Sequence, residues 1–321
     1  MIGAYKIRVK NSKNTYTFEL RRNISILCGD SGRGKTNLYE MIHEYNRFGK
    51  NSGVSISCDR KLIAFDSDDW ENELDKISGA IIVIDEDSSF IRSHDFARKV
   101  NGSDNYYLLI TRNYLAELPY SVDEIFVVSG NSNKKLIPAY KEVERVYNDP
   151  DKKKLPFVPQ FIITEDSNSG YVFFKAQADK LGIECVSARG KSRIQKLIEE
   201  TDSDNIVIIA DGAAFGAEME NVVKQQRLSS KRIAIFLPES FEWLILKSGL
   251  VDKIEPQKLE SPELYADSKE YMSWEQYFSD MLIKLTGRSD YKKYAKDKLP
   301  GFYLQEGSVD AIKHSIRGIK L

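Results

Sequence analysis

Residues 24–41 read ISILCGDSGRGKTNLYEM, and this stretch decides the fold that we expect for the first half of the chain. The apolar run from Ile24 to Cys28 predicts a buried strand, and the residues after Thr36 have the apolar spacing of a helix. Between them, residues 29–36 match the pattern GxxxxGK followed by Ser or Thr, in which glycines let a loop wrap around phosphate oxygens. A strand, a phosphate-binding loop and a helix are therefore expected in that order.

Each part of this loop has an expected role in binding a nucleoside triphosphate. The Lys35 ammonium would neutralise the β- and γ-phosphates, and the Thr36 hydroxyl would ligate Mg²⁺. Backbone N–H groups of the loop would point at the phosphate oxygens. The residues expected to line the nucleotide site are Gly29, Asp30, Ser31, Gly32, Arg33, Gly34, Lys35, Thr36 and Asn37.

A second apolar run supplies the acidic partner that such a loop needs. Residues 80–86 read AIIVIDE, an apolar run followed by Asp85 and Glu86. Asp85 is expected to hold Mg²⁺, and Glu86 stands where a general base would activate the attacking water. An Asp-Glu pair after a strand is also common in solvated turns, but the phosphate-binding loop favours the metal role. Glu86 and Lys35 are therefore the expected catalytic residues.

Two further observations concern the nucleotide itself. The apolar run at residues 106–111, YYLLIT, ends in Thr111 and is followed by Arg112. In the additional-strand ATPases a polar residue at this strand end senses the γ-phosphate, although a solvated strand end explains both residues equally well. A guanine-binding Asn-Lys-x-Asp pattern has its nearest match at residues 133–136, NKKL, which lacks the Asp. ATP is therefore favoured over GTP.

The composition of the 321 residues is that of a globular protein, with 41% hydrophobic and 30% charged residues. The 47 basic and 48 acidic residues neither demand nor exclude a nucleic-acid partner, because such binding depends on local patches. The three cysteines and three histidines are scattered, which argues against a disulfide framework and a His-based metal site. No apolar run is long enough to cross a membrane. We therefore expect a cytoplasmic protein without a membrane partner.

Strand and helix patterns alternate along the chain, which predicts an α/β fold with parallel sheets. Residues 1–148 are expected to form a P-loop domain that begins with a β-hairpin. The segment 149–159, DPDKKKLPFVP, has the prolines and lysines of a linker. Residues 160–270 would form a second, smaller parallel α/β domain, and residues 271–321 a mostly helical tail.

Within these domains the pattern predicts individual elements. A helix is expected at residues 141–147, and two helices of the tail at residues 273–285 and 289–298. Four apolar runs predict the parallel strands of the second domain, at residues 160–164, 184–188, 205–210 and 232–237.

The start of the chain resembles the head domains of ABC, SMC and OLD-type ATPases, in which a small antiparallel sheet precedes the phosphate-loop strand. The resemblance rests on the hairpin followed by residues 23–42, NISILCGDSGRGKTNLYEMI. The chain departs from these families because the stretch from Lys35 to Asp85 is too short for their helical insertion, and it has no LSGGQ-like signature. The resemblance therefore implies a minimal P-loop domain without the dimer-sandwich mechanism.

The second half resembles Toprim domains, the metal-dependent modules of topoisomerases, primases and OLD-family nucleases. The resemblance places Glu165 at the end of the first strand, Gly190 after the second and Asp211 at the end of the third. Toprim domains have Asp-x-Asp at the third strand, and here Ala213 stands in place of the second carboxylate. The resemblance thus implies a metal-dependent, nucleic-acid-processing domain with a degenerate motif.

General chemistry points to a metal ion at the same place. Parallel sheets bind ligands at the carboxyl ends of their strands, and converging carboxylates repel one another unless a cation such as Mg²⁺ or Mn²⁺ lies among them. Acidic residues in loops and first helical turns give an alternative explanation, which stays open. The expected metal ligands of the second domain are Glu165, Asp211, Glu239 and Glu242, with Asp166 beside them.

Two functions remain open on the sequence. The first is an ATPase whose cycle controls a metal-dependent nuclease domain acting on nucleic acid, in defence or on a mobile element, by analogy with OLD-like proteins. The second is a nucleotide-gated binding module whose non-catalytic second domain acts on a protein partner. Ala213 and the lack of an obvious arginine finger favour the second. P-loop ATPases often complete their sites across a subunit interface, so a homo-oligomer is expected in either case.

Overall fold

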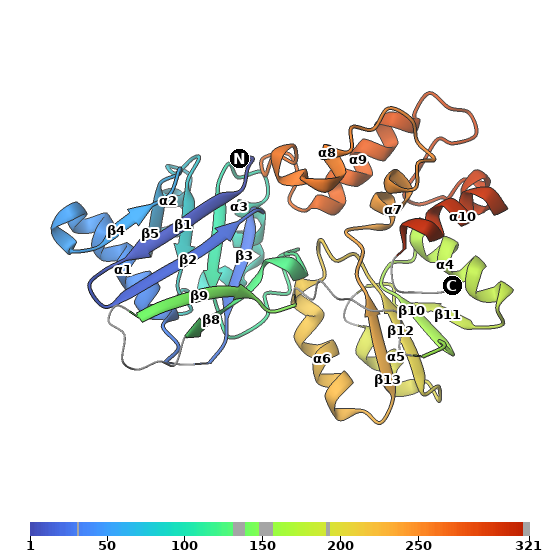
Figure 1. The fold of residues 1–321 in the computed structure, drawn as a ribbon, viewed down its shortest axis with the longest axis horizontal. Coiled ribbons are helices and arrows are strands. Elements are labelled where there is room, and N and C mark those ends of the chain that lie inside the picture. Colours follow the sequence, from blue (N-terminus) through green and yellow to red (C-terminus); the bar gives the residue numbers. More distant parts are fainter. Residues whose placement is uncertain (31, 131–138, 148–156, 191–192, 317–321) are drawn as a thin grey trace. The chain divides into compact units, whose positions relative to one another are not determined.

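The chain folds into two compact units, each built from two separate stretches of sequence (Figure 1). The first unit consists of Met1–Asn148 and Ser261–Ser273, and the second of Asp149–Glu260 and Trp274–Leu321. The structure, a computed structural model, describes residues 1–30, 32–130, 139–147, 157–190 and 193–316. Most of the expected linker at 149–159 lies outside these residues, as does the NKKL segment at 133–136.

The first unit is built on a nine-stranded sheet with the order β4-β1-β2-β9-β8-β3-β7-β6-β5. Its strands are β1 (Tyr5–Lys10), β2 (Asn14–Leu20), β3 (Ile24–Cys28), β4 (Ser55–Ser57), β5 (Leu62–Phe65), β6 (Ile81–Ile84), β7 (Tyr106–Ile110), β8 (Ile125–Gly130) and β9 (Ala139–Arg145). Its helices include α1 (Lys35–Phe48), α2 (Trp70–Leu74) and α3 (His94–Val100).

Five neighbouring strands, β8, β3, β7, β6 and β5, run parallel to one another. Every residue of β6 and β7 is buried, because their continuous apolar side chains are covered on both faces of the sheet. The strand β3 lies between β7 and β8, and β7 in turn pairs with β6. A single strand, β7, therefore separates β3 from β6.

The strands β1 and β2 form the expected antiparallel hairpin, with Tyr5 opposite Leu20 and Lys10 opposite Thr15. Buried and exposed side chains alternate along β1, so one face of the hairpin packs on the core and the other meets solvent. The predicted parallel layer is thus extended by an antiparallel part, and the unit is a mixed α/β structure.

The helix expected at residues 141–147 is wrong. Residues 139–145 form β9, which runs parallel to β2 and antiparallel to β8. Val143 is buried and its neighbours Glu142 and Glu144 are exposed, which is the alternation of a strand with one face on the core. The local pattern of these residues fits a helix. They form a strand because they pair with the edges of β2 and β8.

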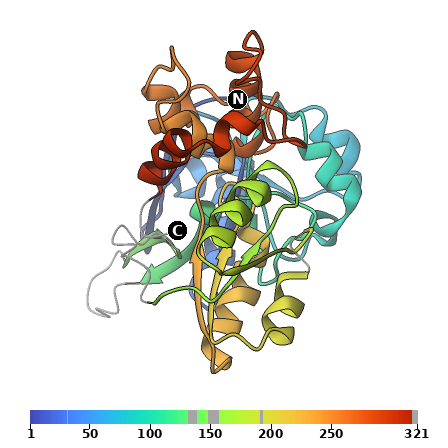
Figure 2. The ribbon, with the colours of Figure 1, turned by 90° about the vertical axis from the view of Figure 1, so that its right-hand side faces the viewer.

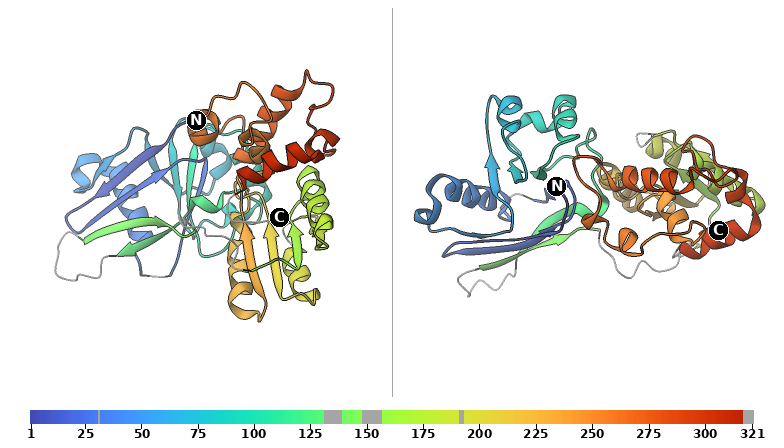
Figure 3. Two further views of the ribbon diagram at one scale, coloured as in Figure 1. Left: turned by 45° about the vertical axis from the view of Figure 1, so that its right-hand side comes forward. Right: turned by 90° about the horizontal axis from the view of Figure 1, so that it is seen from above.

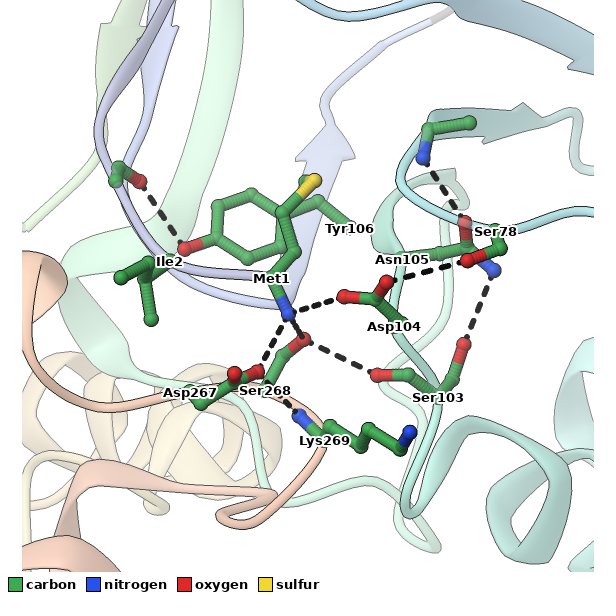
Figure 4. A network of polar contacts seen from close by, with 12 residues as sticks. Met1, Ile2, Ser78, Ser103, Asp104, Asn105, Tyr106, Asp267, Ser268 and Lys269 are labelled. Carbon is green, nitrogen blue, oxygen red and sulfur yellow. Dashed lines mark hydrogen bonds and ion pairs between the residues drawn. The ribbon is translucent and has the colours of Figure 1, made fainter.

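Residues 261–273 return to the first unit and cover the start of the chain (Figure 4). The α-amino group of Met1 lies 2.6 Å from Oδ1 of Asp104 and 2.6 Å from Oδ1 of Asp267. It also donates to Oγ of Ser268 at 2.8 Å, and the Ser268 N–H donates to the Met1 carbonyl at 3.1 Å. These contacts tie three distant stretches of the sequence to one another.

The two carboxylates around Met1 predict a loss of stability in acid. The hydrogen bond to the amino group holds the pKa of Asp104 below its usual value. At Asp267 partial burial raises the pKa, but hydrogen bonds from the amino group and the Lys269 N–H outweigh it, and the pKa is lowered. Groups with a lowered folded pKa stabilise the protein above the unfolded pKa of ~3.9, and this contribution is lost as the pH falls through the folded pKa.

We expect the double variant Asp104→Asn/Asp267→Asn to unfold in denaturant with a lower free energy than the wild type at pH 7. Because these side chains are 41% and 40% exposed, we expect each pair to contribute no more than about 1 kcal/mol. The difference should shrink toward zero below pH 4. The exposed Asp68→Asn variant is the control, and a difference that is the same at pH 7 and pH 3 would contradict the prediction.

The second unit is built on a four-stranded parallel sheet with the order β11-β10-β12-β13, whose strands run side by side in Figure 3. All four expected strands are confirmed; they are β10 (Phe161–Thr164), β11 (Glu184–Ser187), β12 (Asn205–Ile209) and β13 (Arg232–Phe236). The helix α4 (Ser169–Lys180) packs against β10 and β11 and is the yellow-green helix in Figure 2. The helices α5 (Ile194–Glu200) and α6 (Met219–Leu228) contact each other, and α6 packs against β13.

Further helices complete the second unit. The helix expected at 273–285 is confirmed as α9 (Trp274–Thr286), which packs against α7 (Phe241–Lys247). The short α8 (Gln257–Glu260) precedes the return to the first unit, and α10 (Glu306–Ser315), which the sequence left unassigned, also packs against α7. Among the helices of the described ranges, none is both long and apolar enough to cross a membrane.

The helix expected at residues 289–298 is wrong, and this segment follows an irregular path. Tyr294 is buried and its hydroxyl donates to Glu242 at 2.7 Å. The backbone carbonyl of Lys296 accepts a hydrogen bond from the Ser169 N–H at 3.1 Å. Contacts to α7 and α4 thus take the place of hydrogen bonds within a helix.

Candidate functional site

The loop between β3 and α1, residues 29–34, turns through three glycines with left-handed backbone angles. Gly29, Gly32 and Gly34 have φ of 107°, 78° and 109°, a region in which residues with a side chain are strained. A Cβ on Gly34 would also meet the ammonium of Lys141 and the hydroxyl of Tyr16. The positive φ angles therefore explain why glycine stands at these three positions.

The side chain of Lys35 reaches back across the loop. Its ammonium donates to the carbonyl of Gly29 and, at 3.0 Å, to the carbonyl of Asp30, and the residue is buried. Thr36, the next residue of α1, is exposed. A buried ammonium inside a wrapped loop and an exposed hydroxyl beside it are the groups that phosphate and Mg²⁺ require, so these residues fit a magnesium-nucleotide. Ser31 lies outside the described residues.

Two side chains from the antiparallel part of the sheet brace this loop. The hydroxyl of Tyr16, on β2, donates to the carbonyl of Gly34 at 2.8 Å and lies 3.0 Å from Oδ1 of Asn37. The ammonium of Lys141, on β9, donates to the carbonyl of Arg33 at 3.3 Å and lies 5.5 Å from the centre of the Tyr16 ring. Both braces bind carbonyl oxygens, so they hold the loop in shape without occupying its N–H groups.

The hydrogen bond from Tyr16 to the loop predicts that loss of the Tyr16 hydroxyl weakens nucleotide binding. We expect Tyr16→Phe to weaken the binding of a non-hydrolysable ATP analogue about fivefold, because one buried hydrogen bond contributes about 1 kcal/mol. Isothermal titration calorimetry measures the dissociation constant. Tyr45→Phe, which removes a hydroxyl from the far end of the same helix α1, should bind like the wild type. Equal affinities of Tyr16→Phe and wild type would refute the role of the brace.

Asp85 lies at the same edge of the sheet as the loop. In the register of the strands, Leu27 of β3 lies opposite Ile110 of β7, and Leu109 of β7 opposite Ile84 of β6. Since neighbouring strands are ~4.8 Å apart, the end of β6 lies about 10 Å from the end of β3. Burial raises the pKa of Asp85, and the charges of nearby acidic residues raise it further. A cation at this place would relieve that repulsion.

Glu86 and Arg112 form an ion pair at the ends of β6 and β7. The guanidinium donates to both carboxylate oxygens, with Nε 2.9 Å from Oε2 and Nη2 2.7 Å from Oε1. The neighbouring Thr111 is buried, and its hydroxyl donates to the Asn113 carbonyl at 2.9 Å and accepts from the Asn113 N–H at 3.0 Å. Of the two sensor candidates, Arg112 is therefore the one tied to the expected base.

The structure adds residues that the sequence analysis did not single out. Asp66 directly follows β5, and it acts together with Asp85 on the hydroxyl of Tyr39, whose pKa burial raises to about 12. Glu40, on α1, contributes to the raised pKa of Asp85. The position of Asp66 after an apolar run was a usable signal, whereas Glu40 comes near only through the packing of α1.

In the second unit, acidic residues gather at the carboxyl ends of the parallel strands. Thr164 of β10 lies opposite Ile209 of β12, so Glu165 and Asp211 follow neighbouring strands at one edge of the sheet. Burial raises the pKa of Asp211 well above its usual value, and the charges of Glu275, Glu242, Glu165 and Asp166 raise it further. We call these five residues the acidic edge.

The expected metal ligands take different places relative to this edge. Glu165, Asp211 and Glu242 belong to it, but the carboxylate of Glu242 is buried and accepts the hydroxyl of Tyr294 at 2.7 Å. Glu239 meets the loop after β12 through its backbone carbonyl, which accepts from the Ala213 N–H at 3.2 Å. Glu275, which lies on α9, belongs to the acidic edge although no local pattern in the sequence links it to the strands.

A lysine also lies at the acidic edge. Lys296 forms an ion pair with Glu275, and Glu242 and Asp211 also act on its ammonium. Within the residues that the structure describes, no group of three or more His, Cys, Asp or Glu side chains is arranged to hold a metal ion. With Ala213 in place of a carboxylate and a lysine among the acids, these residues do not fit a divalent metal ion.

No protein-family model matches the chain, and no curated protein matches it.

Proposed function

We propose that the first unit binds ATP with Mg²⁺ and hydrolyses it. The observation that carries this proposal is the strand order β3-β7-β6, in which the wrapped glycine loop and Asp85 end at one edge of the sheet with a single strand between them. In this proposal the phosphate chain and its cation lie between the loop and the carboxylate. The proposal treats ATP as the substrate, because no guanine-binding pattern is complete in the sequence.

The chain's own residues divide the work in this proposal. Lys35 neutralises the β- and γ-phosphates once its ammonium turns from the loop carbonyls to them. Mg²⁺, which Thr36 and Asp85 would hold, supplies the remaining positive charge. Glu86 accepts a proton from the attacking water.

Glu86 can accept this proton only when its ion pair with Arg112 has opened. A carboxylate whose two oxygens both accept from one guanidinium is poorly placed to take a proton from water. The γ-phosphate is a competing anion for which a guanidinium has high affinity. ATP therefore draws Arg112 away and frees Glu86, which couples substrate binding to activation of the base.

Two substitutions test the hydrolase. We expect Glu86→Gln to lower kcat on the order of 100-fold or more while the affinity for ATP is kept, because the amide cannot accept the proton. Lys35→Ala should abolish measurable ATP binding. Phosphate release and calorimetry give the two readouts, and the exposed Glu44→Gln on α1 should behave like the wild type. Absence of ATP binding to the wild type would end the proposal, and unchanged turnover in Glu86→Gln would remove Glu86 as the base.

For the second unit we propose the gated binding role, in which a Toprim-like sheet without a metal centre binds a partner and the ATP cycle sets its affinity. Ala213 and the engagement of Glu242 by Tyr294 support this role over the nuclease that the resemblance implies. Both roles share the same first unit, so the ATPase assays do not separate them.

A cleavage assay separates the binding role from the nuclease. We expect the wild type to leave single- and double-stranded DNA and RNA intact with Mg²⁺ or Mn²⁺, with and without ATP. Asp211→Ala and Glu165→Ala serve as the matched variants. Cleavage by the wild type that is lost in both variants would establish the nuclease and overturn the binding role.

A further inference from the structure

The path of the chain at residues 294–296 places Lys296 at the acidic edge. Ser169, the first residue of α4, donates its N–H to the Lys296 carbonyl at 3.1 Å and its hydroxyl to the Ala295 carbonyl at 3.0 Å. Since α4 begins shortly after β10 ends, these bonds fix Lys296 at the carboxyl end of the sheet. Tyr294 is fixed nearby through its bond to Glu242.

The ammonium of Lys296, whose side chain is 43% exposed, lies near several carboxylates. It forms an ion pair with Glu275 on α9, whose side chain is 19% exposed. Partial burial lowers the pKa of Lys296, but Glu275, Glu242 and Asp211 outweigh this effect and raise it above its usual value. Burial and the charge of Glu242 raise the pKa of Asp166, and the Lys296 ammonium acts against this rise. One lysine thus compensates carboxylates from the ends of both β10 and β12, and from α7 and α9.

We propose that Lys296 is the built-in cation of the acidic edge and takes the place that a divalent metal ion would otherwise occupy. Ionised carboxylates gathered at one point repel one another unless a positive charge lies among them, and an ammonium held there repels a second cation. The proposal deepens the binding role of the second unit, and its test measures metal binding instead of cleavage, so either can fail alone.

The consequence is that removing the lysine should create a metal site. We expect the reference protein, which keeps Lys296 and carries Asp85→Asn like all the others, to show no Mn²⁺ binding that depends on Asp211. In Lys296→Gln the carboxylates lose their internal cation, and Mn²⁺ in millimolar excess should raise the melting temperature by roughly 5 °C. Electron paramagnetic resonance of bound Mn²⁺ should detect one additional site. All proteins carry Asp85→Asn, which removes the expected metal ligand of the first unit.

Matched variants make the outcome specific. Lys293→Gln, an exposed lysine of the same segment, should leave Mn²⁺ binding unchanged, and Lys296→Arg should exclude Mn²⁺ as the wild type does. Adding Asp211→Asn to Lys296→Gln should abolish the new site. If Lys296→Gln does not fold, Lys296→Gln/Glu275→Gln removes one charge of each sign and tests the same site. Mn²⁺ binding by the wild-type edge that Asp211→Asn abolishes, or no gain in any lysine-free variant that folds, overturns the proposal.

Discussion

The hydrogen bonds that join β3, β7 and β6 in parallel are the constraint on which the first unit depends. They bring the glycine loop, the Glu86–Arg112 pair and Asp85 to one edge, although these residues are far apart in the sequence. The same rule acts in the second unit, where β10 and β12 deliver Glu165 and Asp211 to one edge. In both units the strand order determines where the acidic residues lie. Side chains from helices and loops determine which positive charge lies beside them.

The antiparallel strands have a less obvious part in this arrangement. Two of their side chains, Tyr16 and Lys141, bind backbone carbonyls of the loop. Such preorganisation reduces the ordering that a loop must undergo when it binds its ligand. The nine-stranded sheet is therefore more than a scaffold for β3, because its far side shapes the loop that β3 carries.

Local pattern was sufficient for the features that depend on short stretches of sequence. The glycine loop, the buried strand before Asp85 and all four strands of the second unit follow from apolar runs and from glycine positions. The local pattern gave a wrong prediction where strand pairing determines the structure. The residues of β9 fit a helix by their pattern, but they pair with β2 and β8 and form a strand. The local pattern was wrong again around Tyr294, where bonds to α7 and α4 replace those of a helix. Lys296 and Glu275 joined the acidic edge through such contacts, which no spacing in the sequence encodes.

Because residues 261–273 return to the first unit, that unit cannot be completed until late in protein synthesis. A ribosome releases the nine strands of the first sheet well before the stretch that holds Met1, and the four strands of the second sheet emerge in between. The first unit stays incomplete while the strands of the second unit are translated. Asp267 and Ser268 can reach the amino group of Met1 only after that. The second unit in turn lacks α9 and the segment that carries Lys296 until the end of translation, so neither unit has all its residues until stretches from both halves of the chain have been made.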